Sequence, residues 1–334
     1  MLARTSTLRH PAGLQIQTPL LIPSFSSKGL GASARDGKSE ISSILEAASE
    51  FLTESMLVSA YDFHHGNLDR LVAPITDITV VDSGGYETAD QQDLATPYFR
   101  SVEALPRTQE DHAKELERWP KVIPAIFVSY DHGQERVPLE EQIATAKELF
   151  PYAREQLTTI LVRPETKDQR LIQMNRVLAS VDELARFSTI GVTEKELGSS
   201  ALDRMANIAR LRFALDDAGS SAPIHIFGCL DPITVPLYYL AGAEIFDGLS
   251  WMRYGFFDGV AMYRQNSAAL SIGVDRHDDF VKVKTLQDNL GALIDLRNLL
   301  IMFLRDYDFA RFGRHSKTIE TAFELLVARE RRLA

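Results

Sequence analysis

Short apolar, β-branched segments alternate along the chain with longer stretches whose apolar residues recur every three or four positions. The first pattern is typical of buried strands and the second of amphipathic helices. Eight strands are predicted, at residues 17–24, 56–61, 76–81, 122–130, 157–162, 187–192, 224–227 and 243–246. Helices are predicted between them at residues 39–52, 106–119, 137–150, 168–185, 200–218 and 233–241. This alternation favours a parallel (β/α)8 TIM barrel over an open sheet.

The alternation stops after the eighth predicted strand. Residues 251–259 are rich in aromatic residues and glycine, and residues 262–274 are expected to form a hairpin or an appended strand. Two amphipathic helices are predicted at 284–304 and 316–333. No internal repeat or linker is found. We therefore expect one domain spanning residues 1–334, in which residues 255–334 form a mainly helical C-terminal extension that completes the outer layer of the barrel.

The predicted strands end in residues that carry chemistry. In TIM barrels the active site lies at the carboxyl ends of the strands, and these ends hold Asp82, Asp131, Arg163, the loop at Gly191, and Asp247. Carboxylates that crowd together raise one another's pKa. Three acids converging on one opening therefore indicate a site for a ligand, a metal or proton transfer.

One of these ends, Val81-Asp82-Ser83-Gly84-Gly85-Tyr86-Glu87, combines an acid with two glycines. The glycines allow a sharp turn and let a ligand approach the backbone closely, so a flat polar group could lie beside Asp82 and Tyr86. Taken alone, the segment is equally typical of a tight turn between strand and helix, with an aspartate as its cap.

Composition places the chain among folded, enzyme-sized proteins. It has 334 residues, of which 45% are hydrophobic, and no apolar run approaches the roughly 20 residues that cross a bilayer. The first ten residues lack the apolar core of a signal peptide. We therefore expect a cytoplasmic protein without a membrane partner. The single cysteine, Cys229, excludes an internal disulfide and a multi-cysteine zinc site, and a small buried residue is its expected role.

Charge is distributed unevenly along the chain. The net charge is −10, but residues 1–35 carry +4 and residues 253–334 carry +2, which leaves −16 for the middle. The densest basic cluster consists of Arg305, Arg311, Arg314, His315 and Lys317. Such a cluster is typical of a nucleic-acid contact. It is equally typical of a solvated helix end, and the sequence leaves both interpretations open.

Two of the acids suit substitution at a sugar carbon. Asp82 and Asp247 are predicted at different strand ends, so one could attack an anomeric carbon while the other manages the proton of the leaving group. A metal site is the competing use. Magnesium would need further oxygen ligands, and no second acidic pair is spaced to supply them. Covalent chemistry on a glycoside is the favoured interpretation.

Four segments resemble the tRNA-guanine transglycosylase (queuine/archaeosine tRNA-ribosyltransferase) superfamily, and they occur in the order found there. They are Thr18-Pro19-Leu20-Leu21-Ile22-Pro23, Asp82-Ser83-Gly84-Gly85-Tyr86-Glu87, His225-Ile226-Phe227-Gly228 and Gly242-Ala243-Glu244-Ile245-Phe246-Asp247. The resemblance covers about residues 17–253. It implies a (β/α)8 barrel, which agrees with the hydrophobic pattern.

The resemblance implies a pentosyltransferase that exchanges guanine in a nucleic acid for a 7-deazaguanine through a covalent intermediate. Asp247 would be the nucleophile on C1′, and Asp82 the general acid and base. The expected base-binding residues are Ser83, Tyr86, Asp131, Arg163, Gly191 and Phe227. Among them, Asp131 would accept hydrogen bonds from guanine N1 and the exocyclic amine, Tyr86 and Phe227 would stack on the purine, and the Gly191 backbone would contact its edge. Tyr86 and Phe227 could instead be core aromatics, and Asp131 a helix cap.

The chain departs from the family at defined positions, which indicates a divergent branch. Arg163 and Glu87 stand where the family usually has glutamine, and arginine could still donate to guanine O6 or N7. The family's zinc cluster of three cysteines and a histidine cannot form with only Cys229, so no metal or other cofactor is expected. Contacts to a nucleic-acid backbone are expected from Arg253, Arg311, Arg314 and Lys317.

The expected partners are tRNA or DNA, a free purine or 7-deazapurine base and, as one option, a second copy of the chain. Two other functions remain open at this stage. A catalytically silent accessory subunit could bind nucleic acid on the same barrel, although an acidic opening would repel phosphate. A nucleoside hydrolase or glycosidase could use the same two carboxylates on a small molecule, and would need no basic rim.

Overall fold

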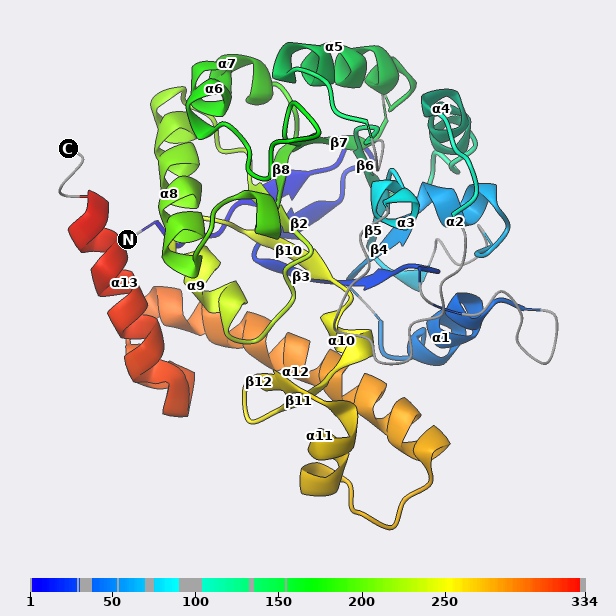
Figure 1. The fold of residues 1–334 in the computed structure, drawn as a ribbon, viewed down its shortest axis with the longest axis vertical. Coiled ribbons are helices and arrows are strands. Elements are labelled where there is room, and N and C mark those ends of the chain that lie inside the picture. Colours follow the sequence, from blue (N-terminus) through cyan, green and yellow to red (C-terminus); the bar gives the residue numbers. More distant parts are fainter. Residues whose placement is uncertain are drawn as a thin grey trace.

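Eight parallel strands close into a barrel in the order in which they occur along the chain (Figure 1). The computed structural model describes residues 2–28, 30, 38–52, 54–69, 75–89, 104–131, 135–153 and 155–330. The barrel strands are β3 (Leu20–Phe25), β4 (Ser55–Ser59), β5 (Ile78–Asp82), β6 (Ala125–Val128), β7 (Leu157–Val162), β8 (Thr189–Thr193), β9 (Ile224–Phe227) and β10 (Ile245–Gly248). All eight predicted strands are thereby confirmed, and β10 closes the barrel by pairing with β3.

The strands are apolar throughout because both of their faces are covered. One cluster of buried side chains fills the barrel interior and includes Leu20, Ile22, Val80 and Ile245. A second, larger cluster lies between the strands and the surrounding helices. A strand buried on both faces appears in sequence as a short continuous apolar run, which is why the pattern identified these segments.

Helices surround the barrel between successive strands (Figure 1). The longer ones are α1 (Glu40–Ala48), α4 (Gln109–Glu117), α5 (Leu139–Leu149), α6 (Met174–Ala179), α7 (Val181–Leu184), α8 (Ala201–Asp217) and α9 (Thr234–Leu240). Short turns of helix follow several strands: α2 (Ala60–His64), α3 (Gly85–Thr88), η2 (Phe150–Ala153), η3 (Glu194–Glu196) and α10 (Ser250–Arg253). The single helix predicted over 168–185 is wrong. Two short helices occur there, separated at Ser180, which leaves helical geometry at φ −103° and ψ 12°.

An antiparallel hairpin that the sequence pattern did not reveal precedes the barrel. It pairs β1 (Thr7–Arg9) with β2 (Gln15–Gln17). Each strand has only one buried residue, Leu8 or Ile16, and these two side chains pack into the interior cluster of the barrel. The hairpin therefore extends the barrel core with two three-residue strands that are too short to give a clear alternating pattern.

A second hairpin follows the barrel, and it lies earlier than predicted. It pairs β11 (Gly255–Phe257) with β12 (Val260–Met262) through Asp258 and Gly259, which both have positive φ. Asp-Gly is among the strongest hairpin signals because a type I′ turn requires this backbone conformation at both positions. Residues 262–274 are not a hairpin or strand, since α11 (Arg264–Ser271) occupies most of them.

The C-terminal region is mainly helical, with α12 (Asp278–Asp306), η4 (Phe309–His315) and α13 (Ser316–Glu330). Helix α12 packs against β3 and α1, and its Arg297 Nε donates a hydrogen bond of 2.8 Å to the carbonyl of Pro19. Helix α13 packs on α8 and α9. These contacts place the region in the outer layer of the barrel. Among the residues the structure describes, no helix combines the length and apolar character needed to cross a membrane.

Candidate active site

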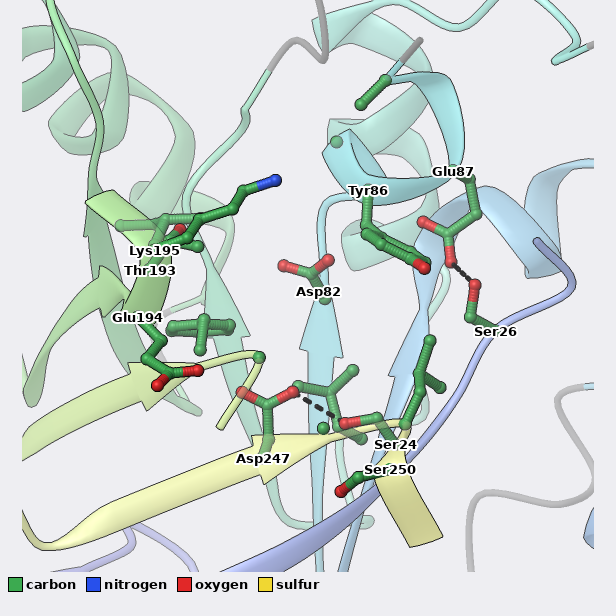
Figure 2. Close-up of a pocket in the computed structure, with 18 of the residues that line it drawn as sticks. Ser24, Ser26, Asp82, Tyr86, Glu87, Thr193, Glu194, Lys195, Asp247 and Ser250 are labelled. Carbon is green, nitrogen blue, oxygen red and sulfur yellow. Dashed lines mark hydrogen bonds between the residues drawn. The ribbon is translucent and has the colours of Figure 1, made fainter. Parts of the chain in front are cut away.

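A cavity of about 360 Å³ opens at the carboxyl ends of the barrel strands, and all eight strands or the loops after them contribute to its wall. Its size is in the range of small-molecule sites. Seven of the predicted site residues line it, namely Asp82, Tyr86, Asp131, Arg163, Phe227, Asp247 and Arg253. Figure 2 shows the carboxylates of Asp82 and Asp247 directed toward the same space. The barrel therefore brings together acids that are 165 positions apart in sequence.

Asp247 is held rigidly by donors from both neighbouring strands. Its Oδ2 accepts a hydrogen bond of 2.7 Å from Ser24 Oγ of β3, and its Oδ1 lies 3.1 Å from His225 Nε2 of β9 (Figure 2 shows the serine contact). An ionised carboxylate only accepts hydrogen bonds, so Nε2 carries the proton in this contact. Two donors on one carboxylate fix its orientation and favour its charged form.

Sequence analysis missed the parts that Ser24 and His225 play beside Asp247. Ser24 is separated from Asp247 by 223 positions, and only the pairing of β10 with β3 brings them together. His225 lies in the segment that resembles the transglycosylases. It is two residues before Phe227 on a strand, so both side chains point to the same side. That alternation is the signal that could have placed His225 near the cavity.

Asp82 lies at the end of β5 in a different electrostatic environment. Its Oδ2 accepts only a long hydrogen bond, 3.4 Å from the Gly84 amide. Burial raises the pKa of Asp82 to about 7, and the negative charges of Glu87, Asp247 and Asp131 contribute to the increase. A carboxyl group with a pKa near 7 can both donate and accept a proton at neutral pH.

Glu87, where the chain departs from the family, is a buried acid beside the cavity. Its carboxylate accepts hydrogen bonds from Ser26 Oγ at 2.5 Å and Ser59 Oγ at 3.2 Å, and Figure 2 shows the first of these on the far side of Tyr86 from Asp82. Burial raises the pKa of Glu87 to about 7, and the charge of Asp62 adds to the effect. Glu87 therefore contributes charge to the site while its oxygens are occupied by serines.

The raised pKa values of Asp82 and Glu87 predict that stability falls as the pH rises. Both groups ionise near pH 4 in the unfolded chain and near pH 7 in the folded one, so between these values the folded state binds more protons. The free energy of unfolding should then decrease by about 1 kcal/mol per pH unit for each group. Urea unfolding of the wild type between pH 4 and pH 8 measures this slope.

The matched variant is the double substitution Asp82→Asn and Glu87→Gln, which keeps both shapes and removes both titrations. We expect its unfolding free energy to vary clearly less with pH over the same window, whatever its absolute stability. An unchanged slope in the double variant would show that other groups cause the dependence.

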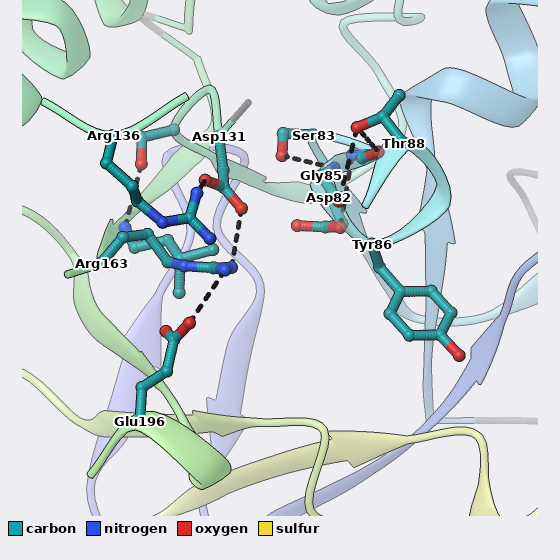
Figure 3. Close-up of polar contacts among 12 residues, drawn as sticks. Asp82, Ser83, Gly85, Tyr86, Thr88, Asp131, Arg136, Arg163 and Glu196 are labelled. Atoms are coloured by element: carbon teal, nitrogen blue, oxygen red, sulfur yellow. Dashed lines mark hydrogen bonds and ion pairs between the residues drawn. The ribbon is translucent and has the colours of Figure 1, made fainter. Parts of the chain in front are cut away.

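Asp131 belongs to an ion-pair network on the opposite wall (Figure 3). Its Oδ2 accepts from Arg163 Nη1 at 2.7 Å, and Arg163 Nη2 donates to Glu196 Oε1 at 3.0 Å. Arg136 Nη1 lies 3.5 Å from Asp131 Oδ1. Although burial disfavours its charge, the carboxylates of Asp131 and Glu196 raise the pKa of Arg163 above its ordinary value. The arginine that replaces the family's glutamine is therefore a buried cation at the cavity wall.

Gly85 is required beside this network. A Cβ at Gly85 would lie 2.3 Å from Asp131 Oδ2 and 2.9 Å from the carbonyl oxygen of Asp131. Any other residue at position 85 would displace the carboxylate from the wall. The glycine in the Asp82 segment therefore provides close approach for an acid of the next strand, which the sequence could not reveal.

Tyr86 lies between two basic side chains at the opening. Lys28 Nζ is 4.5 Å from the centre of the Tyr86 ring and donates to the Tyr86 carbonyl at 2.6 Å. Arg253 Nη2 donates to the Tyr86 hydroxyl at 2.5 Å. The ring lines the cavity together with Arg253, so it is not a core aromatic. These contacts place positive charge at the edge of an acidic cavity.

Phe227 forms the wall of the cavity above β8. Its ring stacks on that of His225, with centres 3.8 Å apart and planes at 28°. A Cβ at Gly191 would lie 2.5 Å from Phe227 Cε2, so the phenylalanine ring covers this glycine. The expectation that the Gly191 backbone faces the ligand therefore needs correction. Thr193, Glu194 and Lys195, at the end of the same strand, line the cavity instead.

Ser83 also lies outside the cavity wall. It is 1% exposed, and its Oγ accepts a hydrogen bond of 3.3 Å from the Gly85 amide (Figure 3). Its place in the site is to hold the turn that carries Tyr86, which differs from the direct base contact that the motif suggested. The turn bends so tightly because Gly84 has a φ of +94°.

The basic residues predicted in the C-terminal region do not line the cavity. Arg311 forms an ion pair with Asp306, which lowers the pKa of that carboxyl to about 2, and Arg314 pairs with Asp258 in the β11–β12 turn. Lys317 is exposed on α13. Because acids satisfy both arginines, the interpretation of this cluster as a nucleic-acid contact loses support. The alternative of a solvated helix end with local ion pairs fits these contacts.

The remaining titratable groups give no metal centre among the residues described. No group of three or more histidine, cysteine, aspartate or glutamate side chains there could hold an ion. Cys229 is 1% exposed, lies 3.3 Å from Thr234 Oγ1, and has its pKa raised by burial, so it is a protonated thiol. The expectation that it is a small buried residue is confirmed.

The fold and the cavity together define a (β/α)8 barrel with two carboxylates in different environments at the catalytic end of its strands. Comparison with protein-family models finds none that matches the chain, and comparison with curated proteins finds no match either.

Proposed function

We propose that this protein is a transglycosylase that exchanges guanine in a nucleic acid for a 7-deazaguanine, acting in the cytoplasm and resembling the tRNA-guanine transglycosylases. One observation carries the proposal: two carboxylates that differ in protonation open into one cavity. Asp247 is hydrogen bonded in its charged form by Ser24 and His225, whereas the pKa of Asp82 is raised to about 7. Carboxylates whose environments differ in this way suit separate roles as nucleophile and acid.

The reaction then has two displacements at C1′ of the ribose. An oxygen of Asp247 attacks C1′, the bond from C1′ to the base breaks, and its electron pair leaves with the base, which takes a proton from Asp82. The incoming base next attacks C1′, gives its proton to Asp82, and the bond between C1′ and Asp247 breaks. Protons and electrons balance over the two steps, and no cofactor is needed.

The Asp131 and Arg163 pair supports guanine as the outgoing base. A carboxylate has about four acceptor positions, and Asp131 uses one for Arg163 at 2.7 Å and a weaker one for Arg136 at 3.5 Å. Guanine presents donors at N1 and N2 beside an acceptor at O6. An acid adjoining an arginine complements this pattern, whereas adenine would place its amino group against the cation. Tyr86 and Phe227 would supply the flat faces on which a purine stacks.

Positive charge at the opening supports a polymer substrate. Lys28, Lys195 and Arg253 lie at or beside the cavity, next to three acids that would otherwise repel phosphate. Tyr86 connects two of these cations through its carbonyl and hydroxyl groups. The chemistry suits both tRNA and DNA, since the two share the phosphate backbone and the guanine base.

Incubation with radiolabelled guanine tests the proposal. Label should enter either bulk tRNA or duplex DNA, and the polymer that accepts it identifies the substrate. Denaturing electrophoresis should then show a protein and nucleic-acid adduct. Label in neither polymer, together with binding of nucleic acid, would favour the accessory subunit, and hydrolysis of free nucleosides would favour a small-molecule enzyme.

A nucleoside hydrolase or glycosidase is the second candidate, and the ion pairs of the C-terminal basic cluster favour it. With Arg311 and Arg314 bound to Asp306 and Asp258, the surface beyond the cavity offers a polymer little free positive charge from these residues. The same two carboxylates would then transfer the sugar to water.

The salt dependence of binding separates the two candidates. If Arg253 contacts a phosphate, Arg253→Gln should weaken binding of tRNA or DNA and reduce the slope of log K against log salt by about 1. The double variant Arg311→Gln and Arg314→Gln is the matched control, and its slope should equal that of the wild type. Titrations at several salt concentrations measure both. A full effect in the control and none at Arg253 would contradict this assignment of the backbone contact.

A further inference from the structure

Helix α12 carries an apolar stripe along its outer face, where the helix lies at the edge of the barrel between α11 and α13 (Figure 1). Its exposed residues recur every three or four positions and are Phe280, Val283, Gln287, Gly291, Ile294, Asn298 and Met302. The four large apolar members are 43–55% exposed. None of the seven is charged, over about 33 Å of helix. Isolated exposed apolar residues need no explanation, but a continuous uncharged stripe indicates an interaction surface.

Gly291, at the centre of the stripe, has no role in the fold of the monomer that the structure reveals. A Cβ at this position would meet no atom within 4 Å. Glycine inside a helix costs about 1 kcal/mol relative to alanine, and here neither a turn nor a neighbouring residue requires it. A missing side chain in mid-helix does allow a second helix to approach closely, because the distance between packed helices depends on the residues at the contact.

We propose that a second copy of this chain packs on the stripe, with the two α12 helices antiparallel and crossing at Gly291. The charges at the ends of the stripe select this arrangement. Asp279 is exposed at the N-terminal end and Arg305 at the C-terminal end, and within the described residues neither has a hydrogen bond or ion pair. Antiparallel pairing brings Asp279 near Arg305 of the second copy. Parallel pairing would bring like charges together.

The same register matches the apolar residues of the two copies. Positions equally far from Gly291 come together, so Phe280 packs against Met302 of the second copy, and the contact repeats on the other side of the twofold axis. A nucleic acid would not choose this surface, since the stripe offers it no positive charge before Arg305. One helix pair is smaller than a standard protein interface, which suggests a dimer of micromolar affinity. The proposal does not depend on the reaction that the cavity catalyses.

Sedimentation equilibrium of the full chain, from micromolar to near-millimolar concentration, tests the dimer. The wild type should convert from monomer to dimer over this range. Gly291→Leu should raise the dissociation constant at least about tenfold because a large side chain separates the helices. Gly291→Ala should retain more affinity than the leucine variant. Both variants should melt no earlier than the wild type, and a wild type that stays monomeric throughout would overturn the proposal.

A charge exchange tests the antiparallel register. Asp279→Arg and Arg305→Asp should each weaken the dimer, whereas the double variant should regain the affinity of the wild type. An apolar surface that bound without a defined register would show no such recovery.

Cysteine cross-linking gives an independent test, made simple because the one native thiol, Cys229, is 1% exposed. Gly291→Cys should form a disulfide-linked dimer under mild oxidation, since the residue at the crossing faces itself. Phe280→Cys and Met302→Cys should link only when the two variants are mixed. Leu325→Cys, on the exposed face of α13, is the matched control and should stay monomeric. Equal cross-linking of the control and Gly291→Cys would overturn the proposal.

Discussion

Replacing Asp247 by asparagine should abolish base exchange and the covalent adduct, with a loss of at least about a thousandfold in kcat. The amide cannot attack C1′, and it cannot accept from both Ser24 and His225 in the way the carboxylate does, at 2.7 Å and 3.1 Å. The measurements are labelled guanine entering the polymer and adduct formation on a denaturing gel.

The matched control for Asp247 is Asp231→Asn, an isosteric change on the neighbouring strand end. Asp231 Oδ1 accepts from the amides of Ile233 and Thr234, and an asparagine oxygen can do the same. This variant should keep wild-type activity. Ser24→Ala should give an intermediate loss, because the nucleophile keeps its charge and loses one of two orienting donors. Persistent adduct in Asp247→Asn would exclude this residue as the nucleophile.

Replacing Asp82 by asparagine should slow exchange by about 10²–10⁴-fold, the usual contribution of a positioned acid or base. It should also change the pH profile. Adduct formation needs the protonated acid, so in the wild type its rate should fall as the pH rises through about 7, the pKa of Asp82. In the variant this limb should disappear. Quenched single-turnover reactions between pH 5 and pH 9 measure both effects.

Glu87→Gln distinguishes a direct role of Asp82 from an indirect one. After burial, the charge of Glu87 is the next largest cause of the raised pKa of Asp82. The substitution should therefore lower that pKa and move the falling limb to lower pH, while adduct formation itself persists. A limb that stays in place in Glu87→Gln and remains in Asp82→Asn would assign the titration to another group.

The fold could be predicted from sequence almost completely because strand and helix periodicities are local. All eight barrel strands are confirmed, since segments buried on both faces appear as continuous apolar runs. The errors lie where local signals are weak or were misread. The helix expected over 168–185 divides at Ser180, and the Asp258-Gly259 turn places the second hairpin before residue 262.

The candidate site could be predicted in part. Acids at strand ends converge because parallel strands in a barrel share one carboxyl edge, so seven predicted residues line one cavity. The partners of these acids could not be predicted. Whether Arg163 binds Asp131, and whether Arg314 binds Asp258 or a phosphate, depends on distances across the fold.

The sequence alone determined that this chain forms a barrel and that Asp82 and Asp247 lie at its catalytic end, because both follow from the order of local patterns. Only the tertiary structure decided how the two acids differ. Ser24 reaches Asp247 from 223 positions away, and Glu87 raises the pKa of Asp82 from within the same buried wall. Burial and charge act through space, so the chemical state of each carboxylate is a property of the closed barrel.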